Sequence, residues 1–161
     1  MRKLLIVLAL SLIAGSVRAD ESIGFKKGDR VVFVGPTFVE RTARFGHLET
    51  ALTLAMPEKE LIFRNLGWSA DTVIGESRGY EKPQSGYANL LRSIRDTKPT
   101  LLFLAYGPAE SWAKTPETFA VNYQKLLNDL KDLSGQKVLI SPFLQENWGP
   151  PMPDPTAHNK D

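Results

Sequence analysis

The chain has 161 residues, with 20 Lys and Arg against 18 Asp and Glu, and it contains no cysteine. Without cysteine, disulfides, thiolate metal sites, a cysteine nucleophile and a cysteine lipid anchor are all excluded. The nearly balanced charge gives no basic excess for binding nucleic acid.

The N-terminal segment, residues 1–19, is predicted to be a signal peptide. Arg2 and Lys3 precede an apolar run of about eleven residues, and small residues end the segment at Val17 and Ala19. The run is shorter than the ~20 apolar residues that span a bilayer. We expect a bacterial protein exported to the periplasm or secreted, cleaved after Ala19 and left without a stable membrane anchor. A buried N-terminal helix is the alternative.

Cleavage would also change the charge. It removes three basic residues and no acidic one, which leaves 17 basic against 18 acidic residues. The predicted domain, residues 20–161, is long enough for one hydrophobic core and too short for two.

Apolar runs and helical stripes alternate along this domain. A β-branched run predicts a strand at 31–34, and Phe45, Leu48, Leu52 and Ala55 recur at the spacing of one helix. A second strand is predicted at 61–63. An amphipathic helix is predicted from Tyr87, Leu90, Leu91 and Ile94.

The second half of the domain continues the alternation. Residues 100–105 form an uninterrupted apolar run, as in a central parallel strand. Thr115 and Pro116 signal a helix start, and its apolar stripe runs from Phe119 to Leu133 before Gly135. A fourth strand is predicted at 138–140.

The order βαβαβαβ predicts a three-layer α/β/α fold with a parallel sheet and helices on both faces. Ligands bind beyond the carboxyl ends of the strands in such sheets. The candidate site is therefore expected in the segments that leave the strands, which are 35–41, 65–76, 106–111 and 142–161.

Three of these segments resemble the conserved blocks of the SGNH (GDSL-type) hydrolases. Gly35-Pro36-Thr37 is similar to the Gly-Asp-Ser block, which places Thr37 at the position of the serine nucleophile. Residues 65–72 are similar to the Asn-x-x-x-Ser-Gly-Asp-Thr block. Ala70 then stands where a glycine N–H serves the oxyanion hole, and Asp71 stands beside it.

The third block and the tail extend the resemblance to about residues 28–161. Residues 107–110 are similar to Gly-x-Asn-Asp, with Ala109 at the asparagine that donates to the oxyanion and Glu110 at the aspartate. Residues 141–159 resemble a subgroup found in environmental bacteria such as planctomycetes. Asp154 and His158 do not form the family's Asp-x-x-His block, because their spacing is one residue too long and they lie too early in the chain.

The resemblance implies a flavodoxin-like SGNH-hydrolase fold and an esterase that removes acyl groups from carbohydrate or lipid esters. It implies no cofactor, and two histidines 111 positions apart give no metal-binding spacing. We expect His47 to be a surface or core residue and His158 a loop residue. The Asp-x-x-His block is expected beyond residue 161, so the C-terminal part of the fold is expected to be missing.

A threonine hydroxyl without a base is a poor nucleophile, so activity is expected to be impaired or absent. The alternatives are a non-catalytic carbohydrate- or ligand-binding module and a non-functional fragment. The alternative role for Thr37 is that of a turn residue whose hydroxyl bonds the backbone. Asp71 could equally hold the turn by bonding neighbouring loop N–H groups or serve the site. Glu110 is expected to pair with Arg41 or Arg44.

Two roles are open for the tryptophans Trp68, Trp112 and Trp148. They could line a sugar-binding cleft, or they could cover the edge of the sheet.

Overall fold

The computed structural model describes residues 23–80, 82–113, 116–133 and 135–160, so the predicted signal peptide lies outside the described residues. Four parallel strands form one sheet in the order β2-β1-β3-β4. They are β1 (Arg30–Val34), β2 (Ile62–Asn65), β3 (Leu101–Leu104) and β4 (Gln136–Leu139). The four predicted strands are confirmed, with boundaries that differ by one or two residues.

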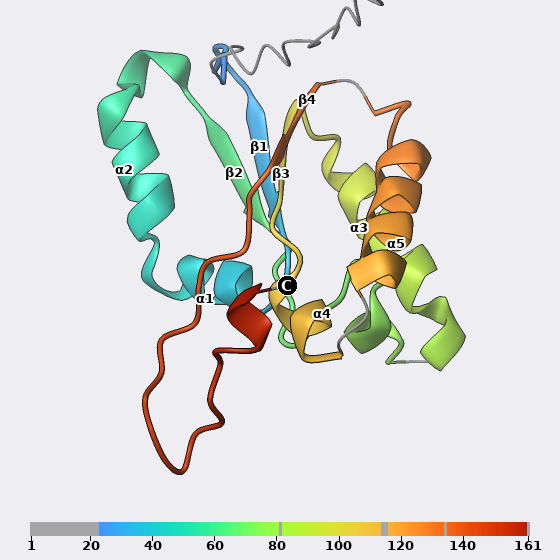
Figure 1. Cartoon of the computed structure of the whole chain (residues 1–161). Coiled ribbons are helices and arrows are strands. Elements are labelled where there is room, and N and C mark those ends of the chain that lie inside the picture. Colours follow the sequence, from blue (N-terminus) through green and yellow to red (C-terminus); the bar gives the residue numbers. More distant parts are fainter. Residues whose placement is uncertain (1–22, 81, 114–115, 134, 161) are drawn as a thin grey trace, which may run out of the picture.

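The helices cover both faces of the sheet. Helices α1 and α2 lie on one side, and α3 and α5 lie on the other (Figure 1). The helices are α1 (Thr37–Phe45), α2 (His47–Ala55), α3 (Gly86–Thr97), α4 (Pro108–Ala113) and α5 (Pro116–Asp129). Short 3-10 turns lie at Pro57–Lys59, Glu76–Arg78, Pro83–Ser85 and His158–Lys160. This is the predicted three-layer α/β/α arrangement.

Two apolar layers hold the helices on the sheet, because successive strand residues point to opposite faces. Towards α3 and α5 the buried residues are Val32, Val34, Leu102, Leu104, Leu90, Ile94, Leu126 and Leu130, together with Val73 and Tyr106. Towards α1 and α2 they are Val31, Phe33, Val39, Leu101, Phe103 and Ala105. The apolar periodicity predicted α3 and α5 because their stripes form the first of these layers.

The single helix predicted around residues 45–55 is wrong. Gly46 adopts a left-handed φ of 63° and separates α1 from α2. Phe45 and Leu48 are exposed as a result, and α2 contributes no fully buried residue. The stripe has helical spacing, but the break at Gly46 turns its first members away from the sheet.

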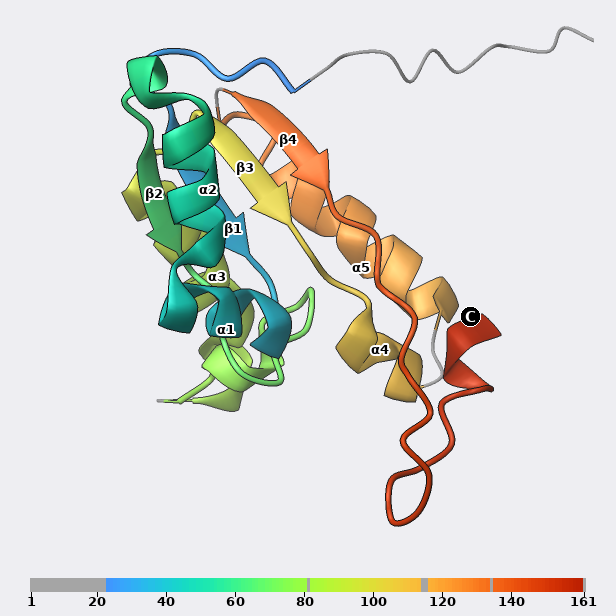
Figure 2. The same cartoon turned by 90° about the vertical axis from the view of Figure 1, so that its left-hand side faces the viewer.

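The strand order makes β1 and β3 neighbours whose following connections diverge. The chain leaves β1 towards the face covered by α1 and α2, whereas it leaves β3 towards the face covered by α5 (Figure 1). Adjacent strands whose connections diverge in this way leave room for a ligand at their carboxyl ends. The segment after β4 extends beyond the same end of the sheet (Figure 2).

Candidate functional site

The loop after β1 passes close to the end of β3. A Cβ on Gly35 would lie 2.6 Å from the Ala105 carbonyl oxygen and 2.7 Å from Val39 Cγ2. Only glycine therefore permits this turn, which places Thr37 at the first position of α1.

The loop after β2 is pressed onto the start of α1. The Asn65 side chain donates to the Val39 carbonyl oxygen at 2.8 Å and accepts from the Gly67 N–H at 2.8 Å. A Cβ on Gly67 would lie 2.1 Å from Glu40 N. Asn65 and Gly67 thus fix the distance between the first two blocks, a role that we did not assign to them from the sequence.

Thr37 and Ala70, predicted as the nucleophile and oxyanion positions, lie in direct contact. The Ala70 N–H donates to Thr37 Oγ1 at 3.0 Å. The neighbouring Ser69 hydroxyl donates to the Glu40 carboxylate. Ala70 has a φ of +54°, a left-handed conformation that glycine adopts without strain. This backbone conformation is a physical reason for the glycine that the Asn-x-x-x-Ser-Gly-Asp-Thr block has at the position of Ala70.

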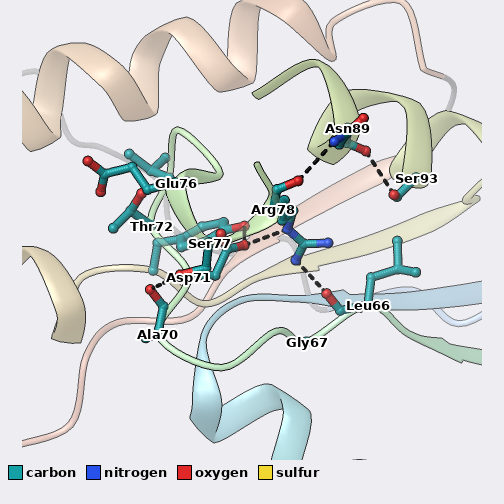
Figure 3. A network of polar contacts seen from close by, with 12 residues as sticks. Leu66, Gly67, Ala70, Asp71, Thr72, Glu76, Ser77, Arg78, Asn89 and Ser93 are labelled. Carbon is teal, nitrogen blue, oxygen red and sulfur yellow. Dashed lines mark hydrogen bonds and ion pairs between the residues drawn. The ribbon is translucent and has the colours of Figure 1, made fainter. Parts of the chain in front are cut away.

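Asp71 points into the protein and is fully buried. Its Oδ2 accepts from Arg78 Nε at 2.7 Å (Figure 3) and from the Tyr106 hydroxyl at 3.1 Å. Burial raises the pKa of Asp71 above 3.8, and the Arg78 charge opposes this shift. Burial also raises the pKa of Tyr106 well above its usual value, and the Asp71 charge adds to the effect. The contacts of Asp71 are those of a residue that holds the loop.

Arg78 is the centre of this network, and the sequence did not single it out. It is 4% exposed, and besides Asp71 it binds the Leu66 carbonyl oxygen at 2.7 Å (Figure 3). Its own carbonyl oxygen accepts from Asn89 at 2.8 Å, and its guanidinium lies 5.7 Å from the Trp68 ring centre. The Arg78 side chain therefore cross-links the loop after β2 internally, and its backbone carbonyl oxygen joins that loop to α3.

Glu110 joins the loops that follow β2 and β3. Its Oε1 accepts from the Val73 N–H at 2.7 Å, and its Oε2 accepts from the Gly107 N–H at 3.1 Å. The expected pairing with Arg41 or Arg44 is wrong, because α4 turns this carboxylate inward onto backbone donors. Burial, followed by the Glu110 charge, raises the pKa of nearby Tyr123 to about 12.

Ala109 lies in the first turn of α4 and is half-buried. Its methyl group has no donor for an oxyanion. The preceding Gly107 has a φ of +130°, and a Cβ there would lie 2.5 Å from Pro142 Cγ. The segment after β4 thus packs directly against the loop after β3.

The segment after β4, residues 141–160, forms an open groove that we call the tail groove. Its apolar lining is Phe143, Leu144, Trp148, Met152, Pro153 and Pro155. Trp148 is 78% exposed and does not cover the sheet edge. Trp68 instead stacks on Tyr80 at 6.1 Å, and the side chain of Trp112 lies outside the described part of the chain.

No histidine, aspartate or glutamate within the described ranges hydrogen-bonds to the Thr37 hydroxyl. His47 begins α2, is exposed and stacks on Phe45. The same residues contain no group of three or more His, Cys, Asp or Glu side chains that could hold a metal ion. Nor do they include a helix that is both long and apolar enough to span a membrane.

No family model matches the chain, and no curated protein matches its sequence. Its structure is similar to that of LAE5, an alpha/beta hydrolase enzyme from the metagenome of Lake Arreo, Spain, with a TM-score of 0.60 and 15% identity. The match covers 76% of this chain and 64% of LAE5.

A variant of Axe2, an acetyl xylan esterase from Geobacillus stearothermophilus, matches with a TM-score of 0.56 and 16% identity over 74% of this chain and 62% of Axe2. A gut microbial diltiazem-metabolizing enzyme matches with a TM-score of 0.56 and 19% identity, over 73% of this chain and 28% of that enzyme. The chain thus spans less than two thirds of the length of LAE5 and of Axe2. It has the α/β fold of these hydrolases over that span.

Proposed function

We propose that residues 20–161 form an exported SGNH-hydrolase-like domain, derived from ester hydrolases, whose own turnover of esters is impaired or absent. The hydrogen bond from the Ala70 N–H to Thr37 Oγ1 carries this proposal. It joins the positions that resemble a nucleophile and an oxyanion donor, which supports descent from an esterase. It also occupies the donor that an oxyanion would need.

The chemistry of Thr37 supports impairment. A hydroxyl attacks an ester only when a positioned base takes its proton. Among the described residues the Thr37 hydroxyl has one hydrogen-bond partner, and that partner is a donor. Loss of the base in a serine-hydrolase template costs up to ~10⁶ in turnover. Loss of one oxyanion donor, as at Ala109, costs ~10²–10³.

The substrate class rests on the structural neighbours and on the family resemblance. Axe2 is an acetyl xylan esterase, and the resembling family acts on acyl esters. We propose an ester of a small molecule, a carbohydrate or a lipid as the ligand. The order of charged, apolar and small residues in 1–19 supports export to the periplasm or the medium.

Hydrolysis of p-nitrophenyl acetate tests the proposal. We expect the native protein and Thr37→Val to show the same rate, close to background. Thr50→Val on the exposed side of α2 is the matched control. Saturation kinetics in the native protein that persist in Thr50→Val and vanish in Thr37→Val would make Thr37 a working nucleophile and would refute the inactive assignment.

The tail groove favours a second candidate function, a non-catalytic module that binds carbohydrate or another ligand. Such a module keeps a ligand-binding surface at the strand ends without the base. It predicts saturable ligand binding in a protein that shows no Thr37-dependent turnover.

A further inference from the structure

The Ser69 hydroxyl and the Glu40 carboxylate form a pair that the proposed function does not use. Ser69 Oγ donates a hydrogen bond to Glu40 Oε2, and both residues are exposed to solvent. Glu40 lies in the first turn of α1, and Ser69 lies in the loop after β2. A hydroxyl that donates to an exposed carboxylate therefore stands near the carboxyl ends of β1 and β2.

The fold brings this pair together across 29 positions of the chain. A Cβ on Gly67 would lie 2.1 Å from Glu40 N, so the loop after β2 approaches the backbone of α1 closely at Glu40. On the other side of Ser69, the Ala70 N–H donates to Thr37 Oγ1 at 3.0 Å. Contacts before and after Ser69 thus hold it beside Glu40.

Ser69 meets a chemical requirement that Thr37 does not meet. A hydroxyl becomes a nucleophile when an adjacent base accepts its proton. The Thr37 hydroxyl oxygen accepts from the Ala70 N–H, whereas the Ser69 hydroxyl donates to a carboxylate, which can take the proton. The serine hydroxyl is also less crowded than the hydroxyl of the β-branched threonine.

Two hydroxyl groups elsewhere at this end of the sheet also donate to carboxylates, and they differ from Ser69. Tyr106 is 1% exposed and donates to the fully buried Asp71, so this pair is closed to solvent. Thr156 donates to Asp154 at 2.6 Å, two positions away, and Asp154 also accepts the Thr156 N–H, as in an Asx turn. Ser69 combines exposure with a carboxylate that a different element supplies.

We propose that Ser69 is a nucleophile towards small-molecule esters, with Glu40 as its base. Ser69 Oγ forms a bond to the ester carbonyl carbon while its proton passes to Glu40, and the bond to the alcohol oxygen breaks as Glu40 returns the proton to that oxygen. Water then attacks the acylated Ser69, Glu40 takes a proton from the water, and the proton returns to Ser69 Oγ as its bond to the acyl carbon breaks. This inference rests on the proposed function, because it assigns the impaired turnover to Ser69 and gives Thr37 no part in it.

The same geometry limits the rate. The Ala70 N–H, next to Ser69, is bound to Thr37 and is not free for an oxyanion. Loss of one oxyanion donor costs ~10²–10³ in turnover. Base catalysis by a positioned side chain contributes ~10²–10⁴. We therefore expect slow acylation of Ser69, in agreement with an impaired esterase.

Phenylmethylsulfonyl fluoride tests the inference on the full chain, with the modified residue located by peptide mass spectrometry. Its reaction forms a bond from Ser69 Oγ to sulfur, releases fluoride and passes the proton to Glu40. We expect an adduct on Ser69 in the native protein and none at this position in Ser69→Ala. Glu40→Gln keeps a hydrogen-bond acceptor for Ser69 but removes the base, so it should slow labelling about 10²–10⁴-fold.

Thr156→Val is the matched control, because it removes a hydroxyl that also donates to an exposed carboxylate. It should be labelled on Ser69 at the native rate. No adduct in the native protein, an adduct confined to other residues, or equal labelling rates in the native protein and Glu40→Gln would overturn the inference. An adduct on Thr37 would overturn the proposed function as well, whereas the absence of any adduct would overturn the role of Ser69 alone.

Discussion

Two loops at the same end of the sheet are built in different ways. The β2 loop, residues 66–80, is cross-linked by the buried Arg78 side chain. It is tied to the rest of the protein by Glu110, Asn89 and Tyr106, which bind the Val73 N–H, the Arg78 carbonyl oxygen and the Asp71 carboxylate. The tail, residues 141–160, takes the hydrogen bonds of Asn147, Asp154 and Asn159 from within itself.

The difference separates two tasks. The β2 loop positions Ala70 against Thr37 by means of buried polar contacts, so its geometry depends on the folded core. The tail exposes apolar side chains, and its shape depends on local turns. Segments with few buried contacts have low local stability, whereas buried networks share the stability of the core. We therefore expect substitutions in the β2 loop to destabilise the whole fold and those in the tail to have local effects.

The largest expected effect is that of Arg78→Met, which leaves the buried Asp71 carboxylate without its cation. Removing one partner of a buried ion pair costs about 3–5 kcal/mol. The free energy of unfolding, measured by urea denaturation, should fall by about that amount. Lys27→Met, which breaks an exposed pair with Glu60 at 2.7 Å, is the control and should cause no measurable change. Equal losses in both variants would show that the buried network does not hold the fold.

A smaller effect is expected from one glycine in each loop. Gly67→Ala would place a methyl group against Glu40 N and force the loop away from α1, at a cost of about 1–3 kcal/mol. Gly149→Ala in the tail meets no atom within 4 Å and costs only the strain of its φ of +70°, about 1 kcal/mol. Thermal unfolding of both variants measures the difference. A larger loss for Gly149→Ala would reverse the comparison of the loops.

The smallest expected effect is an increase in the free energy of unfolding. Ala70→Gly relieves the strain of a φ of +54° and should raise the free energy of unfolding by about 0.5–1 kcal/mol. Ala120→Gly on the exposed side of α5 is the control and should lower it by about 0.5–1 kcal/mol. A loss in Ala70→Gly similar to that in Ala120→Gly would mean that Ala70 is not strained.

The layers of the fold could be predicted from the sequence because buried strands and amphipathic helices leave clear periodic patterns. The run at 100–105 and the stripe of α3 are examples, and both lie in the core. The break at Gly46 could not be predicted in the same way. The apolar spacing runs through it, and the left-handed φ depends on how α1 and α2 pack.

The candidate site was predictable in outline only. Parallel strands bring their carboxyl ends together, which indicated that Thr37 and Ala70 would be close. Glu110 binds backbone N–H groups, and because every residue except proline carries one, the sequence does not indicate which of them it binds. Arg78 follows a polar stretch in the sequence, and nothing local distinguishes it from a surface arginine.

The central claim is that the Thr37 hydroxyl and the Ala70 N–H satisfy one another, and amide hydrogen exchange of Ala70 tests it most directly. One hydrogen bond is worth about 1 kcal/mol, so the Ala70 amide should exchange about five- to tenfold more slowly in the native protein than in Thr37→Val. Thr37→Ser, which keeps the acceptor oxygen, should retain the protection. Equal exchange rates in the native protein and Thr37→Val would contradict the account.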